Sequence, residues 1–158
     1  MPTLEGASLP PGSHVPRVLV VDEEPTPRSD LCRMVRGMGY EVHAVGDGRA
    51  ALRYLQQHPG EIRLLLADVL LPLMDGGELA ERARDAEPGL RVVLMVSEPR
   101  AATADLLAGY RDLPLLDKPV AFNVLYELLV ERLGPPQPGA LRPRASRPIL
   151  FRDRAPRS

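Results

Sequence analysis

The amino-acid sequence predicts a single α/β domain of the doubly wound type, in which helices cover both faces of a parallel sheet. Short apolar runs of strand length alternate five times with stretches of helical spacing between residues 17 and 133. Within the third run, Leu64, Leu65 and Leu66 leave no polar face, as expected of a strand buried on both sides. The chain of 158 residues is long enough for one such core and too short for two.

The expected strands are, in chain order, Val18–Val21, Val42–Val45, Ile62–Ala67, Val92–Val96 and Leu113–Leu116. A helix with an apolar stripe on one face is expected after each strand. The stripe residues are Leu31, Met34, Val35 and Met38 in the first helix, Ala51, Leu52 and Leu55 in the second, Leu79 and Ala83 in the third, Ala104, Leu106, Leu107 and Ala108 in a short fourth, and Leu125, Leu128, Leu129 and Leu133 in the fifth. Gly39 stands just past the first helix, where glycine commonly ends helices.

Two proline-rich segments flank the predicted domain, which spans residues 17–133. Residues 1–16 hold four prolines without apolar periodicity and are expected to form a flexible leader. Residues 134–158 hold six prolines and six arginines against one acid, Asp153, and are expected to be disordered. No DNA-binding or catalytic domain is expected after residue 133. The tail carries a net charge of +5, so residues 1–133 carry −6 of the total of −1.

Composition narrows the class of protein. No run approaches eighteen apolar residues, so no membrane span is expected. The single cysteine, Cys32, is expected to be a buried structural thiol, and with no secretory signal it indicates a cytoplasmic protein. The three histidines are scattered without ligand spacing, which argues against zinc or haem. Nucleic-acid binding by the basic tail stays an alternative to a solubilising role, but Phe151 is the tail's only aromatic residue for base stacking.

Charged and polar side chains follow the expected strands, at the sheet edge where this class of fold places its ligands. Asp22-Glu23-Glu24 follows the first strand, Asp68 the third, Ser97 the fourth and Lys118 the fifth. Converging carboxylates are costly unless a hard cation such as Mg²⁺ neutralises them. A carboxylate held there can attack a phosphoryl donor, while the metal and an ammonium stabilise the developing charge. Lys118 is the only lysine among twenty cationic side chains, which favours a specific role for it.

Each of these residues has a simpler interpretation when it is taken alone. The acids after the first strand are typical of a solvated loop or a helix start, and Asp68 and Ser97 of helix caps. Asp75-Gly76 is an ordinary signal for a turn into a helix. Their joint placement at alternate strand ends is what favours a phosphoacceptor site.

The runs RVLVVDEE, LLLADVLLPLMDG, VVLMVS and LLDKP, in this order, closely resemble the receiver domain of bacterial response regulators. The resemblance covers roughly residues 17–133 and implies a flavodoxin-like five-stranded parallel sheet in the order 2-1-3-4-5. It implies that Asp68 accepts a phosphoryl group from a histidine kinase or a histidine phosphotransfer protein. The further roles it implies are Mg²⁺ binding by Asp22, Glu23, Asp68 and the backbone carbonyl of Leu70, a switch hydroxyl on Ser97, a phosphoryl contact from Lys118, and a cis peptide bond at Pro119.

The sequence departs from the family pattern at several positions. Leu115 stands at the output-switch position, where many receivers carry an aromatic residue. Glu98 replaces a small residue beside Ser97 and is expected to slow phosphorylation by small anionic donors. Leu70 and Pro99 occupy positions that often orient the hydrolytic water, which predicts a long-lived phosphoryl group on Asp68.

The leading hypothesis is a phosphorylation-controlled switch that is not itself an enzyme, although it promotes its own Mg²⁺-dependent phosphorylation and dephosphorylation. It signals by binding partners, as a single-domain regulator or as a receiver of the hybrid-kinase kind. A homodimer through the fourth helix, fifth strand and fifth helix is possible, although residues 109–113 are two longer than usual. The alternative is a phosphorylation-independent interaction module, which Glu98 and Leu115 favour. The presence of Asp22, Glu23, Asp68, Ser97 and Lys118 argues against it.

Overall fold

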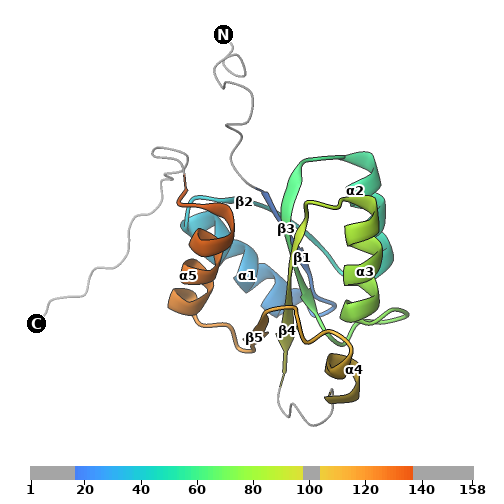
Figure 1. Cartoon of the computed structure of the whole chain (residues 1–158). Helices are drawn as coiled ribbons and strands as arrows, with labels where there is room; N and C mark the ends of the chain where they lie inside the picture. Colours follow the sequence, from blue (N-terminus) through green and yellow to red (C-terminus); the bar gives the residue numbers. More distant parts are fainter. Residues whose placement is uncertain (1–16, 98–103, 137–158) are drawn as a thin grey trace, which may run out of the picture.

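The computed structural model describes residues 17–97 and 104–136, which form a five-stranded parallel sheet between two layers of helices (Figure 1). The strands are β1 (Arg17–Val21), β2 (Glu41–Val45), β3 (Ile62–Asp68), β4 (Arg91–Val96) and β5 (Leu115–Asp117). The helices are α1 (Pro25–Gly37), α2 (Gly48–Gln57), α3 (Gly76–Ala86), α4 (Ala104–Ala108) and α5 (Phe122–Leu133). The sheet order is β2-β1-β3-β4-β5, so the predicted fold class and strand order are confirmed.

The alternation of side chains along β1 creates two separate cores. Leu19 and Val21 face the side covered by α2 and α3, and Val18 and Val20 face the side covered by α1 and α5. The three leucines of β3 divide between the same two cores, since Leu65 joins the first and Leu64 and Leu66 the second. All three are fully buried, which explains why no polar residue is found in this part of the sequence.

Local capping fixes where the helices begin and end. The Asp47 carboxylate accepts a hydrogen bond from the Ala50 amide at 2.8 Å at the start of α2. The Asp75 carboxylate does the same for the Glu78 amide at 2.9 Å at the start of α3. After α1 the chain turns at Gly39 with φ of 102°, the left-handed conformation expected of a glycine past a helix end. Cys32 is buried in α1, as predicted.

The fifth strand is shorter than predicted and begins later. Leu113 is buried, but its amide donates to the Tyr110 carbonyl at 3.1 Å in a turn instead of entering the sheet. Pro114 has no amide proton to donate to the ladder, so the strand starts at Leu115. The predicted start at Leu113 was therefore wrong, because burial in a turn leaves the same apolar pattern as burial in a strand.

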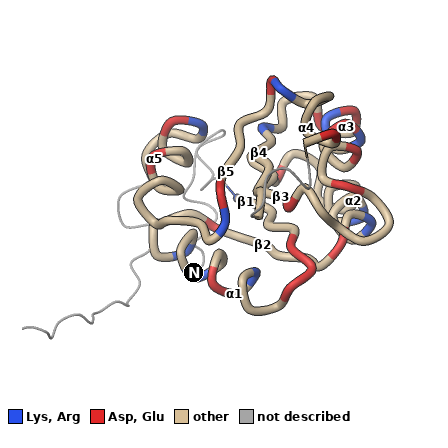
Figure 2. Tube along the Cα trace, turned by 90° about the horizontal axis from the view of Figure 1, so that it is seen from below, with Lys and Arg blue, Asp and Glu red and all other residues tan. Residues whose placement is uncertain are grey.

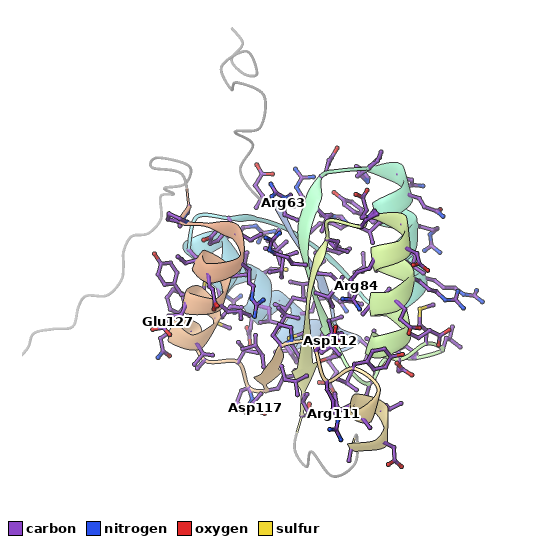
Figure 3. All side chains as sticks on the ribbon, viewed as in Figure 1. Arg63, Arg84, Arg111, Asp112, Asp117 and Glu127 are labelled. Carbon is purple, nitrogen blue, oxygen red and sulfur yellow. The ribbon has the colours of Figure 1, made fainter. Side chains whose placement is uncertain are left out.

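The segment between α4 and β5 is attached to α3. The Tyr110 ring lies over Gly77, where an added Cβ would come within 2.1 Å of a ring carbon. A guanidinium nitrogen of Arg84 lies 3.9 Å from a carboxylate oxygen of Asp112 (Figure 3). This segment thus places an aromatic ring and an ion pair against the side of α3. Its lengthening relative to common receivers stays a prediction.

The packed part of the chain continues past residue 133. The Tyr40 hydroxyl donates a hydrogen bond of 2.6 Å to the Gly134 carbonyl, and the Pro136 ring lies against Gly39. Burial raises the pKa of Tyr40 to about 12, which keeps the phenol protonated as a donor. The predicted leader and all of the predicted tail beyond Pro136 lie outside the described residues. None of the described helices is both long and apolar enough to cross a membrane.

Gly76 and Gly77 offer a matched pair of stability tests, because each faces a different kind of neighbour. A Cβ on Gly77 would meet the side chain of Tyr110, which can swing outward, whereas a Cβ on Gly76 would lie 2.2 Å from the backbone oxygen of Asp68. We expect Gly77→Ala to lower the free energy of unfolding by about 1–2 kcal/mol and Gly76→Ala by more than about 3 kcal/mol. Urea unfolding measures both, and equal losses would contradict this account.

Candidate functional site

The predicted site residues converge at the carboxyl edge of the sheet, which faces the viewer in Figure 2. Asp22 directly follows β1, Asp68 is the last residue of β3, Ser97 follows β4 and Lys118 follows β5. A cavity of about 160 Å³ opens here, lined by Glu23, Glu24, Asp68, Val69, Leu70, Met95, Ser97 and Lys118. Parallel strands place their carboxyl ends together, so residues from distant parts of the chain share this cavity.

Lys118 connects the two buried carboxylates. Its ammonium lies 2.8 Å from Oδ2 of Asp22 and 3.0 Å from Oδ1 of Asp68. Asp22 is fully buried and Asp68 nearly so. Because burial strips water from all three groups, each of these contacts is stronger than a surface ion pair.

The charges of the site do not balance. Burial and the neighbouring Asp22 carboxylate together raise the pKa of Asp68 to about 7, although Lys118 opposes both effects. Burial alone would lower the pKa of Lys118, but hydrogen bonds to Asp22 and Asp68 raise it overall, so the ammonium stays charged. One ammonium therefore stands against two carboxylates, and a further cation would stabilise the ionised site.

The backbone around Asp22 is held by several hydrogen bonds. The side-chain Oδ1 of Asp22 accepts a hydrogen bond of 2.9 Å from the Glu24 amide, which folds the acidic loop back on itself. The guanidinium of Arg28 donates to the Asp22 carbonyl at 2.7 Å and also lies against Gly46, where an added Cβ would come within 3.2 Å of it. Arg28 thus ties α1 to the ends of β1 and β2. This role of Arg28 was not predictable from the sequence, because the contact depends on how α1 packs.

The donor atoms at the cavity are suited to a hard divalent cation. Asp68 and Glu23 supply carboxylate oxygens, and the predicted carbonyl ligand Leu70 belongs to the same lining. Glu24 also lines the cavity but is not a predicted ligand. Among the described residues no three acids, histidines or cysteines form a ready-made metal cluster. Mg²⁺ needs no such cluster, since it typically takes one or two carboxylates and keeps several waters. The donor set therefore fits Mg²⁺, with Lys118 sharing the buried carboxylates.

The remaining predicted residues occupy different surroundings. Ser97 is exposed at the cavity, and the Lys118–Pro119 peptide bond is cis. Leu115 is half-buried against the core on the α2 and α3 side of the sheet. The predictions for Glu98 and Pro99 fall outside the described residues.

The loop between β3 and α3 is fixed at both ends. The Gly76 amide donates to the Val69 carbonyl at 2.8 Å, closing the loop just after the phosphoacceptor candidate Asp68. Met74 is buried and packs over Gly48 at the start of α2. Between these anchors, Leu73 adopts φ of 72°, a conformation that L-residues other than glycine rarely take. The left-handed backbone of Leu73 was not predicted from the sequence, although the few residues between Asp68 and the helix start at Gly76 indicated a tight loop.

Comparison with known proteins identifies the family. The family model for the response regulator receiver domain matches residues 18–130. The chain belongs to this family. It is 32% identical over 103 residues to the response regulator receiver protein CpdR of Brucella abortus, covering 65% of this chain and 84% of that relative. The sensor kinase CckA of the same organism is 28% identical over 116 residues, and this receiver spans only 12% of its length.

Solved structures of response regulators superpose on this chain. A putative response regulator from Chloroflexus aurantiacus superposes with a TM-score of 0.67 at 26% identity, covering 76% of this chain and 98% of the other. A response regulator receiver domain protein from Clostridium thermocellum superposes with a TM-score of 0.68 at 20% identity. The match covers 75% of this chain and 94% of the other. Receivers are signalling domains of two-component systems, and the family generally binds Mg²⁺ in its acidic pocket.

Proposed function

We propose that this receiver accepts a phosphoryl group on Asp68 from the phosphohistidine of a kinase or phosphotransfer protein, and that it signals through partner binding. The observation that carries the proposal is the placement of the Lys118 ammonium 3.0 Å from Asp68, with which it lines the cavity, and 2.8 Å from the buried Asp22 behind them. This arrangement holds the candidate nucleophile next to a fixed positive charge.

In the proposed reaction, an Oδ atom of Asp68 attacks phosphorus, the P–N bond of the phosphohistidine breaks, and its electron pair returns to the imidazole. Lys118 neutralises the charge that develops on the phosphoryl oxygens. Asp22, Glu23, Asp68 and the backbone carbonyl of Leu70 would hold Mg²⁺, which supplies further charge neutralisation when bound. The Ser97 hydroxyl, exposed at the same cavity, would then donate to a phosphoryl oxygen.

Two classes of partner follow from this proposal. The first is the phosphodonor, and the likeness to parts of sensor kinases supports a kinase in this role. The second is a second copy of the chain, since α5 exposes three large apolar side chains, Phe122, Val124 and Tyr126. A cytoplasmic location, expected from the lone cysteine, stays a prediction, as does the absence of nucleic-acid binding.

Mg²⁺ titration distinguishes the proposal from a phosphorylation-independent module. We expect calorimetry to show Mg²⁺ binding to the full chain, weakened about tenfold by Glu23→Gln, which corresponds to about 1.4 kcal/mol. Glu24→Gln is the matched control, because Glu24 lines the same cavity but is not a predicted ligand. No Mg²⁺ binding by the wild type would favour the interaction module, and equal effects of the two variants would refute the ligand assignment.

The phosphoryl group on Asp68 is predicted to be long-lived. The apolar side chain of Leu70, which lines the cavity and is 55% exposed, has no polar group to orient a hydrolytic water. We expect the decay of labelled receiver at neutral pH to accelerate in Leu70→Asn, whose amide can hold that water. A lifetime of seconds in the wild type would contradict the prediction.

A further inference from the structure

Every polar group of Asp22 takes part in a hydrogen bond. The backbone amide donates to the Val45 carbonyl at 3.2 Å, and the backbone carbonyl accepts from Nη1 of Arg28 at 2.7 Å. The carboxylate accepts at Oδ1 from the Glu24 amide at 2.9 Å and at Oδ2 from the Lys118 ammonium at 2.8 Å. Because Asp22 is fully buried, these contacts stand in place of water. The position of its carboxylate therefore depends on four partners.

Two of these partners line the cavity and two do not. Glu24 and Lys118 line it, and a Mg²⁺ ion bound there would compete with the Lys118 ammonium for Oδ2 of Asp22. Val45 and Arg28 hold the backbone of Asp22 and are not part of the cavity lining. These two contacts remain when the carboxylate exchanges its partner. Of the two, only the contact from Arg28 comes from a side chain.

The guanidinium of Arg28 is held from two sides. The Arg28 amide donates to the Glu24 carbonyl at 3.1 Å in the first turn of α1, which fixes the base of the side chain. At the other end, Nη1 lies so close to Gly46 that an added Cβ would come within 3.2 Å of it. Gly46 does not have a positive φ, so its backbone is open to other residues. The missing side chain of Gly46 thus leaves room for the guanidinium.

We propose that Arg28 is a positioning residue for Mg²⁺ binding, because it keeps the backbone of Asp22 in place when the ion displaces Lys118. The inference rests on the proposed function, in which Asp22 is a ligand of Mg²⁺. Arg28 itself would contact neither the ion nor the phosphoryl group. Its positive charge acts in the opposite direction, since a guanidinium near the site repels a divalent cation. Removing Arg28 would tighten Mg²⁺ binding if its charge were decisive, and weakens the binding if its positioning is decisive.

Calorimetric titration of the full chain with Mg²⁺, without any phosphodonor, measures the sign of this effect. We expect Arg28→Met to weaken Mg²⁺ binding about tenfold, because the Asp22 carbonyl loses a charged donor. Arg28→Lys keeps a charged donor, so its affinity should lie between those of Arg28→Met and the wild type. Arg36→Met is the matched control for charge, since Arg36 is exposed in the last turn of α1, about 12 Å further along the helix. We expect it not to weaken Mg²⁺ binding.

Gly46→Ala tests the same contact while every charge is kept. The new Cβ would push the guanidinium of Arg28 away from the Asp22 carbonyl, so we expect Mg²⁺ binding to weaken about threefold. In the Arg28→Met background the same change should have no further effect, because the side chain that it displaces is gone. Equal losses in the two backgrounds would overturn the role assigned to the contact between Gly46 and Arg28.

The dependence of phosphoryl transfer on Mg²⁺ separates positioning from a general structural defect. At saturating Mg²⁺ we expect a kinase to label Arg28→Met within about twofold of the wild-type rate, with the loss confined to limiting Mg²⁺. A lower rate at saturation overturns the inference, since Arg28 would then act beyond ion binding. Urea unfolding without Mg²⁺ checks that each variant is folded.

The remaining outcomes distinguish this inference from the proposed function. Unchanged or tighter Mg²⁺ binding in Arg28→Met overturns the inference and leaves Asp68 as the proposed phosphoacceptor. A wild-type chain that binds Mg²⁺ but is labelled by no kinase in a panel overturns the proposed function, while the effect of Arg28 on Mg²⁺ affinity still decides the inference. A wild-type chain that binds no Mg²⁺ overturns both.

Discussion

Asp68→Asn is expected to abolish labelling of this receiver by a phosphorylated histidine kinase, a loss of at least about a thousandfold. The amide removes the attacking oxygen while keeping the shape of the side chain. Asp85→Asn is the matched control, because Asp85 is an exposed acid on α3 away from the cavity. Transfer that persists in Asp68→Asn would move the nucleophile to another residue.

The same variant should remain folded, which makes the loss of labelling interpretable. Because burial raises the pKa of Asp68 to about 7, the folded state binds more protons than the unfolded state between the ordinary pKa of 3.8 and that value. Stability from this group is therefore present at low pH and is lost as the pH rises toward 7. We expect the neutral amide to leave the free energy of unfolding at pH 8 unchanged or higher, as measured in urea without Mg²⁺.

Lys118→Met is expected to have opposite effects on phosphoryl transfer and on Mg²⁺ binding. Removing the ammonium should slow transfer about a hundredfold or more, because it removes charge stabilisation next to Asp68. The same change frees the oxygens of Asp22 and Asp68 that Lys118 now occupies, so Mg²⁺ should bind more tightly. Transfer kinetics and calorimetric titration measure the two effects.

Arg82→Met is the control for a general loss of positive charge. Arg82 forms an exposed ion pair with Glu78 on α3, with 3.0 Å between the guanidinium nitrogen and the carboxylate oxygen. Such exposed pairs contribute little to the stability of a protein. We expect neither transfer nor Mg²⁺ affinity to change measurably in this variant. Weaker Mg²⁺ binding in Lys118→Met would indicate that the ammonium organises the carboxylates instead of competing for them.

The sequence was sufficient to predict the sheet and the edge at which its polar residues meet. Strands buried on both faces leave continuous apolar runs, and in a parallel sheet the residue that follows each run lies at one edge. Asp22, Asp68 and Lys118 were found for this reason, and the structure brings them into hydrogen-bonding contact. Their functional roles stay predictions until transfer is measured.

Features that depend on contacts between distant segments were not predictable in this way. The hydrogen bond from Arg28 to Asp22, the ring of Tyr110 over Gly77 and the late start of β5 each depend on how helices and turns pack. The left-handed backbone of Leu73 runs against the preference of its residue type, so local propensity points away from it. These exceptions lie near the proposed site, where local rules yield to the demands of the surrounding structure.

The hydrogen bond between Tyr40 and Gly134 has a practical consequence for handling the protein. It holds the chain after α5 next to the start of β2, and β1 begins at the same edge of the sheet, opposite to Asp68 (Figure 1). The 12 residues of α5 separate this exit from the cavity by about 18 Å. A dye or a surface anchor attached at Arg17 or Pro136 would thus lie on the far side, leaving the cavity mouth open to a docking kinase.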